Sequence, residues 1–210
     1  MKIIESIDEM REYSQQCKRD GKTVASIETG GDLHEGHMSL VKIARDNADV
    51  VILSIGHAYQ REGRPIENYK EILEEYKQIE LISDVELCQS HGVDIIFHSF
   101  DSSWNYEVPL DIPIPIVERL MKHRNPPPIP LEVLTTWPQI LDVERPDVTI
   151  LGQKDIYQNF VVKSIIDKLN FPIKVIMAPT IRDSDGIACS SRNKFLTRAE
   201  RERAVSIYKA

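Results

Sequence analysis

The sequence lacks the features that mark secreted, disulfide-bonded and membrane-spanning proteins. Its 210 residues include only three cysteines, Cys17, Cys88 and Cys189, which form neither a CxxC pair nor an even-numbered framework. We recognise no signal peptide, no long apolar run, no internal repeat and no low-complexity tract. These absences predict a protein of the reducing cytoplasm that does not enter a membrane.

Positive charge is also scarce. The chain has 26 lysines and arginines against 33 aspartates and glutamates, which gives a formal net charge of −7. Because general binding to nucleic acid or to an anionic membrane surface requires a basic face, we expect neither partner. One small anionic nucleotide is still compatible with this charge, because a local cluster can be basic within an acidic protein.

The rest of the composition is that of an ordinary globular domain, with 41% hydrophobic and 28% charged residues. At this length we expect a single domain over residues 1–210, with a core over about 1–190 and a helical tail over about 194–210.

Strand patterns and helix patterns alternate along most of the chain. Apolar, β-branched runs predict strands at 23–27, 49–55, 93–97, 148–151 and 173–177. Helical spacing of apolar residues predicts helices at 4–19, at 37–45, at about 66–91 and at about 155–169. This alternation predicts an α/β fold, a Rossmann-like doubly wound parallel sheet with helices on both faces and ligands at the carboxyl ends of its strands.

Two stretches interrupt the alternation. Residues 100–116 mix polar residues with prolines, and residues 125–130 hold four prolines in six positions. Proline lacks a backbone donor and fixes φ, so the second stretch is interpreted as a rigid, extended surface connection. A polyproline ligand for a partner domain is the alternative.

A glycine–histidine turn follows the first of these buried strands. It runs from Gly30 to His37, and a helix is expected to start at about Gly36. Free N–H groups at a helix start favour a phosphate, and two imidazoles three residues apart can stabilise charge there. The same letters also fit half of a metal site, or a purely structural turn with incidental histidines.

Two further loops follow later strands. Lys154 comes just after Gly152 at the end of a strand, where it can meet a phosphate, and Asp155 can cap the next helix or bind ribose or Mg²⁺. Ser190, Ser191 and Arg192 offer two hydroxyls and a guanidinium to a triphosphate. Each loop alone also fits an ordinary surface turn, and Cys189 is interpreted as a small buried residue rather than a nucleophile.

Together these segments resemble the pantothenate synthetase (pantoate–β-alanine ligase) family of the HIGH-motif nucleotidyltransferase superfamily. The resemblance is carried by Gly31-Asp32-Leu33-His34-Glu35-Gly36-His37-Met38-Ser39-Leu40-Val41, by Gly152-Gln153-Lys154-Asp155, and by the run from Asp185 to Asn193 with Leu196-Thr197 behind it. Their order and separations fit the nucleotide-binding domain of that family from end to end, most weakly over about 100–145.

The resemblance implies a ligase that adenylates a small hydroxy acid such as pantoate and condenses the acyl-adenylate with an amine such as β-alanine. It implies catalytic roles for His37, His34, Lys154 and Arg192. It implies that ATP contacts Gly30, Gly31, Asp32, Leu33, His34, Gly36, His37, Gly152, Lys154, Asp155, Ile181, Ser190, Ser191 and Arg192. Mg²⁺ would bridge the outer phosphates with no protein ligand assigned, Gln60 and Gln158 would hold the acid, and a homodimer is expected.

The sequence departs from the family on the acid and amine sides of the site. The family's Pro-Thr-Met-Gly-Asn reads Glu28-Thr29-Gly30-Gly31-Asp32 here, which adds two acids near the phosphate site. The loop before Gln60 is one residue shorter than in the family. Where the family has an Arg-Pro-Gly-His-Phe-Arg-Gly-Val segment, this sequence has only residues 124–130. The chain also ends where the family begins its C-terminal lid domain, so we expect the domain without that lid.

These departures leave other functions open. The chain could act on a different acid or amine, with His57 and Tyr59 contacting the acid, or it could be a nucleotidyltransferase for a phosphate ester. It could also be a nucleotide-binding subunit without turnover. His57 is alternatively an exposed loop residue, and His91, His98 and His123 are expected at the surface or in loops.

Overall fold

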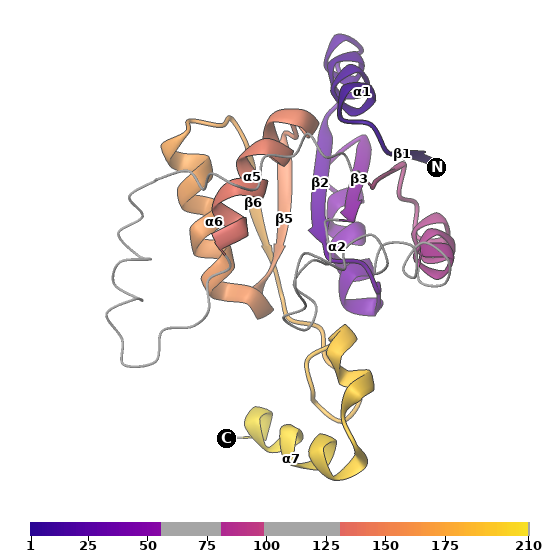
Figure 1. The fold of residues 1–210 in the computed structure, drawn as a ribbon, viewed down its shortest axis with the longest axis vertical. Helices are drawn as coiled ribbons and strands as arrows, with labels where there is room; N and C mark the ends of the chain where they lie inside the picture. The colour runs from indigo at the N-terminus through magenta and orange to yellow at the C-terminus, as the bar shows by residue number, and fades with distance from the viewer. Residues whose placement is uncertain (56–80, 99–130, 210) are drawn as a thin grey trace, which may run out of the picture.

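A computed structural model describes residues 1–55, 81–98 and 131–209 of the chain. Its centre is a six-stranded parallel sheet in the order β1-β4-β3-β2-β5-β6 (Figure 1). The strands are β1 (Lys2–Ile4), β2 (Val24–Thr29), β3 (Val50–Ile55), β4 (Ile95–Phe97), β5 (Val148–Gly152) and β6 (Lys174–Ala178). All six residues of β3 are buried, as expected for a central strand that is covered on both faces.

The direction of strand addition reverses at β2, where the sheet also opens. The strands β3 and β4 follow on one side of β2, and β5 and β6 follow on the other. The strand β2 pairs with β5 at two positions, Ala25 with Val148 and Ser26 with Thr149. In contrast, β2 remains paired with β3 up to Thr29 and its partner Ile55. The strand β5 remains paired with β6 up to Gly152 and its partner Ala178. The strands β2 and β5 therefore separate toward their carboxyl ends, at the point where ligands bind in open α/β sheets.

Helices cover both faces of this sheet. The helices α1 (Ile7–Arg19) and α5 (Leu131–Glu144) pack on one face, where α6 (Ile156–Lys168) continues the layer beside α5. The other face packs against α2 (Glu35–Arg45) and the helical residues 81–90. Alternate residues of β3 serve the two layers, because successive strand side chains point to opposite faces.

The C-terminal segment leaves the sheet from its carboxyl edge. Beyond β6 the chain forms the short 3₁₀ helix η4 (Ser191–Phe195) and the helix α7 (Arg198–Lys209). Figure 1 shows α7 away from the sheet, on the side toward which β2 and β5 point. The division into a core and a tail remains a prediction, although α7 agrees with the helix expected there.

The predicted α/β fold is confirmed, with differences at particular elements. The strand β1 and the helix α5 were not predicted, and the first helix begins at Ile7 because Ser6 caps it. His98 is not a surface residue, because its side chain is fully buried directly after β4. His57, Tyr59, Gln60, His123 and the proline run at 125–130 lie outside the described residues.

Candidate active site

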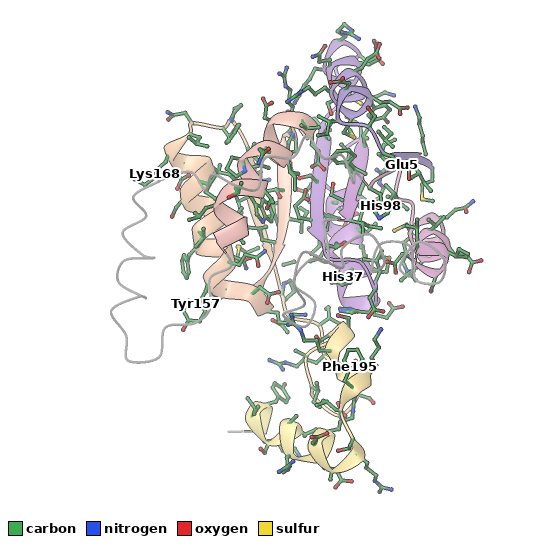
Figure 2. All side chains as sticks on the ribbon, in the orientation of Figure 1. Glu5, His37, His98, Tyr157, Lys168 and Phe195 are labelled. Carbon is green, nitrogen blue, oxygen red and sulfur yellow. The ribbon has the colours of Figure 1, made fainter. Side chains whose placement is uncertain are left out.

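Three loops meet at the opening between β2 and β5. They are the turn after β2, the 3₁₀ helix η3 (Gln153–Asp155) after β5, and the loop from β6 to η4. Figure 2 shows His37 at this carboxyl edge, between the sheet and the segment that carries Phe195. The sequence motifs that were predicted to form one site are therefore adjacent in space.

The turn after β2 takes a backbone path that favours glycine. Gly31 has a φ of 75° and Asp32 a φ of 53°, so two successive residues lie in the left-handed region. The Thr29 hydroxyl accepts a hydrogen bond from the Gly31 N–H at 3.3 Å and donates one to the Ser54 carbonyl at 3.0 Å. This hydroxyl joins the strained turn to the two central strands.

A buried carboxylate supports the same turn from the neighbouring helical segment. Asp84 is 3% exposed, and its two oxygens accept hydrogen bonds from the N–H groups of Asp32 at 2.9 Å and Leu33 at 2.7 Å. Hydrogen bonds to an ionised acceptor are stronger than neutral ones, so Asp84 fixes the conformation of the turn. The sequence analysis missed this residue, although it falls on the apolar stripe of Leu81, Val85 and Cys88.

The two histidines form a capping box at the start of α2. The Nδ1 atom of His34 accepts from the Gly36 N–H at 3.1 Å, and the Nδ1 atom of His37 accepts from the His34 N–H at 3.2 Å. A neutral ring whose Nδ1 accepts carries its proton on Nε2. Both rings can therefore donate from Nε2 while they remain neutral.

Burial and charge also favour a neutral His34 ring. Burial, followed by the nearby positive charge of Lys154, lowers the pKa of His34. The rings of His34 and His37 stack with their centroids 4.1 Å apart, so two imidazolium charges would repel each other there. The pair is therefore suited to donate hydrogen bonds to a phosphate without adding full positive charge.

Gly36 permits this arrangement because it has no side chain. A Cβ atom at this position would lie 2.8 Å from His34 Cε1 and 3.2 Å from the Cβ of Cys189. The glycine is thus required for close approach of the ring and of the loop after β6. Cys189 itself donates from Sγ to Asp183 at 3.2 Å, and burial raises the pKa of its thiol, which agrees with a structural role.

Lys154 connects the second loop to the third. Its Nζ atom donates to the Cys189 carbonyl at 3.0 Å, directly before Ser190. The Ser190 hydroxyl accepts from the Arg192 N–H at 3.3 Å and caps η4. These contacts hold the lysine, the serine and Arg192 on one wall of the site.

The third loop is held in turn by α7. Arg201 donates to Asp183 at 2.7 Å and to Asp185 at 2.6 Å, and these ion pairs hold the pKa of both carboxyls below the usual range. The Arg182 guanidinium lies 4.1 Å from the ring centre of Tyr208, also on α7. Sequence analysis gave no role to Arg201, because a single arginine on a polar helix carries no signal of its partner.

An ion pair joins the first loop to the third across the site. Lys194 Nζ lies 2.6 Å from Asp32 Oδ2, so the negative charge expected from Asp32 is paired in this structure. A cavity of about 480 Å³ opens beside these loops. It is lined by residues of the second loop, the third loop and α7: Lys154, Arg182, Gly186, Ile187, Ala188, Ser190, Ala204, Ile207 and Tyr208.

The second predicted acid, Glu28, has a buried carboxyl. Glu28 points to the α5 face of the sheet, with its carboxyl oxygens buried near Glu144. Burial first, and the Glu144 carboxyl second, raise the pKa of Glu28 well above its ordinary value. The raised pKa favours the neutral form of this carboxyl, which argues against the expected negative charge from Glu28.

The remaining predicted residues occupy varied positions. Gly30 is exposed, Gly152 ends β5, and Ile181 accepts at its carbonyl from the Cys189 N–H at 2.9 Å. Asp155 stands at the N-cap of α6, but its side chain makes no capping hydrogen bond, contrary to the capping role predicted for it. Gln158 lies in the first turn of α6 and is partly exposed.

The described part of the chain contains neither a cluster of metal-ligating side chains nor a membrane-spanning helix. No group of three or more histidine, cysteine, aspartate or glutamate side chains in residues 1–55, 81–98 and 131–209 could hold a metal ion. None of the helices in those ranges is long and apolar enough to cross a membrane.

Comparison with known proteins gives one consistent family. The family profile described as pantoate-beta-alanine ligase matches residues 2–210. Pantothenate synthetases of Thermotoga petrophila and Geobacillus thermodenitrificans are 36% and 34% identical to the whole chain, which covers 73% and 71% of their lengths.

Solved structures agree with the sequence relatives. The pantoate-beta-alanine ligase of Francisella tularensis, complexed with beta-gamma ATP and beta-alanine, matches the whole chain at 28% identity with a TM-score of 0.80. The chain covers 78% of that protein, and it covers 72% of the pantothenate synthetase of Thermus thermophilus, at 25% identity and a TM-score of 0.73. The chain belongs to the pantoate–β-alanine ligase family.

Proposed function

We propose that the chain is an ATP-dependent ligase that adenylates pantoate and joins the acyl-adenylate to β-alanine. The observation that carries this proposal is the pair of stacked histidines at the start of α2, beside the opening of the sheet, whose Nδ1 atoms both accept backbone hydrogen bonds and so leave Nε2 as the donor of each ring. The family supplies the substrates, since a relative binds beta-gamma ATP and beta-alanine.

The reaction has two balanced steps. In the first, a pantoate carboxylate oxygen attacks the α-phosphorus of ATP, the bond to the β-phosphate oxygen breaks, and pyrophosphate leaves. In the second, the amine nitrogen attacks the acyl carbon, the bond to the AMP oxygen breaks, and the amine loses a proton as the amide forms. Orientation and charge stabilisation account for most of what a protein contributes to such transfers.

The described residues divide this work. His34 and His37 would donate to phosphate oxygens, and His37 is proposed to stabilise the transition state. Lys154 and Arg192 would neutralise the triphosphate, which Ser190 and Ser191 would bind through their hydroxyls. Backbone around the nucleotide would come from Gly30, Gly31, Asp32, Leu33, Gly36 and Gly152, with Asp155 near the ribose and Ile181 beside the nucleoside.

Three finer statements also belong to the proposal. Mg²⁺ would bridge the outer phosphates, with ATP itself supplying the oxygen ligands that this ion prefers. A homodimer is expected from the family resemblance, and sedimentation of the chain tests it. The cytoplasm is the expected compartment because all three cysteines are free and buried.

ATP–pyrophosphate exchange tests the proposed function. Wild-type protein should exchange label into ATP only when pantoate is present, and His37→Ala should lower the exchange rate by about 10² or more. His91→Ala is a matched control, because His91 is an exposed histidine outside the three loops. Exchange that depends on a phosphate ester, or ATP binding without any acid-dependent exchange, would replace the ligase with one of the alternative functions.

A further inference from the structure

Most backbone donors of the phosphate turn, residues 30–37, are engaged within the protein. Their acceptors are the Thr29 hydroxyl, the Asp84 carboxylate, and atoms of His34 and His37. An N–H group that is engaged in this way offers little to a phosphate, so side chains must balance most of the charge of a triphosphate at this turn. The engaged N–H groups belong to Gly31, Asp32, Leu33, His34, Gly36 and His37.

Lys194 brings a positive charge to this turn from the third loop. It lies on η4, two residues after Arg192, and its Nζ atom is 2.6 Å from Asp32 Oδ2. The Lys194 side chain is about half exposed, whereas that of Asp32 is 24% exposed. Figure 2 shows the next residue, Phe195, on the segment that faces the edge of the sheet where His37 lies. The ammonium group therefore reaches the mouth of the site.

The same two loops also touch beside the histidines. A Cβ atom at Gly36 would lie 2.8 Å from His34 Cε1 and 3.2 Å from the Cβ of Cys189 in the third loop. The Asp32 carboxylate is near enough to His34 to oppose the lowering of the pKa of that ring. A phosphate that accepts from the histidines would therefore lie close to both members of the Asp32–Lys194 ion pair.

A carboxylate and a phosphate make the same demand on a lysine, since both are oxyanions that accept from its ammonium group. Asp32 holds Lys194 where a phosphate oxygen can replace the carboxylate, and it also places a negative charge beside that phosphate. Loss of the lysine and loss of the carboxylate charge should therefore affect triphosphate binding in opposite directions. A pair that served only to clamp the two loops together would instead weaken binding when either member was lost.

We propose that Lys194 is a further phosphate-binding residue of the ATP site and that Asp32 competes with the triphosphate for it. This inference rests on the proposed function, because its ligand is the ATP of that reaction. When ATP binds, the Lys194 ammonium exchanges the Asp32 carboxylate for a phosphate oxygen, and no covalent bond forms or breaks. Asp32 is thus the counter-ion that keeps Lys194 at the phosphate turn, and its charge limits the affinity for ATP.

The test is equilibrium binding of ATP with Mg²⁺, measured by calorimetry in the absence of pantoate. Lys194→Met should raise the dissociation constant for ATP by about five- to tenfold, as expected for a charge-assisted hydrogen bond from a partly exposed side chain. Asp32→Asn should lower it by about threefold or more, because it removes the competing charge. Asparagine keeps the size of the side chain and tolerates the φ of 53° at this position. Neither variant should change the dissociation constant for adenosine, which has no phosphate.

Lys163→Met and Asp167→Asn are the matched controls, because Lys163 and Asp167 form an exposed ion pair at 3.0 Å on α6 and should not affect ATP binding. Unchanged ATP affinity in Lys194→Met, or weaker ATP binding in both Lys194→Met and Asp32→Asn, overturns the inference. Thermal unfolding identifies a folding defect, and Lys194→Gln decides the result if Lys194→Met does not fold. The proposed function fails separately, if the wild type binds ATP but shows no exchange with pantoate.

Discussion

Replacement of Asp84 by asparagine isolates the support of the phosphate turn. The carboxylate accepts from two backbone donors, the N–H groups of Asp32 and Leu33. In Asp84→Asn one oxygen can still accept, whereas the new amide group faces a donor that loses its partner. The substitution keeps the size of the side chain, so the surrounding core is not disturbed.

The magnitude follows from these two hydrogen bonds. A bond to a charged group contributes about 1.5–3 kcal/mol, and an unsatisfied donor adds about 1–3 kcal/mol when it is kept from water. Since the turn can relax, about 2–4 kcal/mol is a reasonable total. At about 1.4 kcal/mol for each factor of ten, kcat/KM for ATP in the exchange reaction should fall by roughly 30-fold to 700-fold.

The assay compares Asp84→Asn with Asp49→Asn. Asp49 also accepts a backbone hydrogen bond through its carboxylate, from Thr23 at 2.8 Å, but it does so at the opposite edge of the sheet. Asp49→Asn should therefore leave the exchange rate unchanged. A loss of less than about threefold in Asp84→Asn, with both proteins folded, would refute the conclusion that Asp84 fixes the turn.

Two other predictions concern the histidine cap and the buried acids. Gly36→Ala should displace the His34 ring, because the new methyl group would lie 2.8 Å from it. We expect kcat to fall by about tenfold, with little change in the thermal unfolding temperature. An unchanged kcat would contradict the packing argument. Because the folded-state pKa values of Glu28 and Glu144 are raised, their contribution to the free energy of unfolding is fully present below about pH 4.5 and should be lost as pH rises through the folded-state pKa values. Urea unfolding from about pH 5 to about pH 9 measures how the free energy of unfolding changes with pH. This change should be smaller in Glu144→Gln than in the wild type. An equal change in the two proteins would mean that the acids are already ionised.

The strands of the sheet were predictable where a run of residues has a strand-like composition of its own. The runs around β2, β3 and β5 are apolar and β-branched, and the turn after β2 has the glycines that its left-handed backbone favours. The strand β1 has only three residues, so its pattern is too short to recognise. The helix α5 contains Pro138, and a proline inside a helix argues against that helix in any sequence-based analysis.

The site was predictable in its loops and unpredictable in what supports them. His34, Lys154 and Ser190 follow strand ends, so the parallel sheet brings them together. Asp84 and Arg201 act through partners that are 51 and 18 residues away in sequence, which only the folded chain reveals. Glu28 was interpreted as a charge near the phosphate site because its raised pKa depends on burial and on Glu144, neither of which a local pattern encodes.

Isotope transfer tests the central claim that pantoate is activated as an acyl-adenylate. Pantoate labelled with ¹⁸O in both carboxylate oxygens is incubated with the protein, ATP, Mg²⁺ and β-alanine, and the products are analysed by mass spectrometry. Attack of the carboxylate on the α-phosphorus leaves one labelled oxygen on AMP after the amide has formed, so the account predicts AMP that carries one ¹⁸O. Unlabelled AMP, or label in inorganic phosphate with ADP as the nucleotide product, would contradict it.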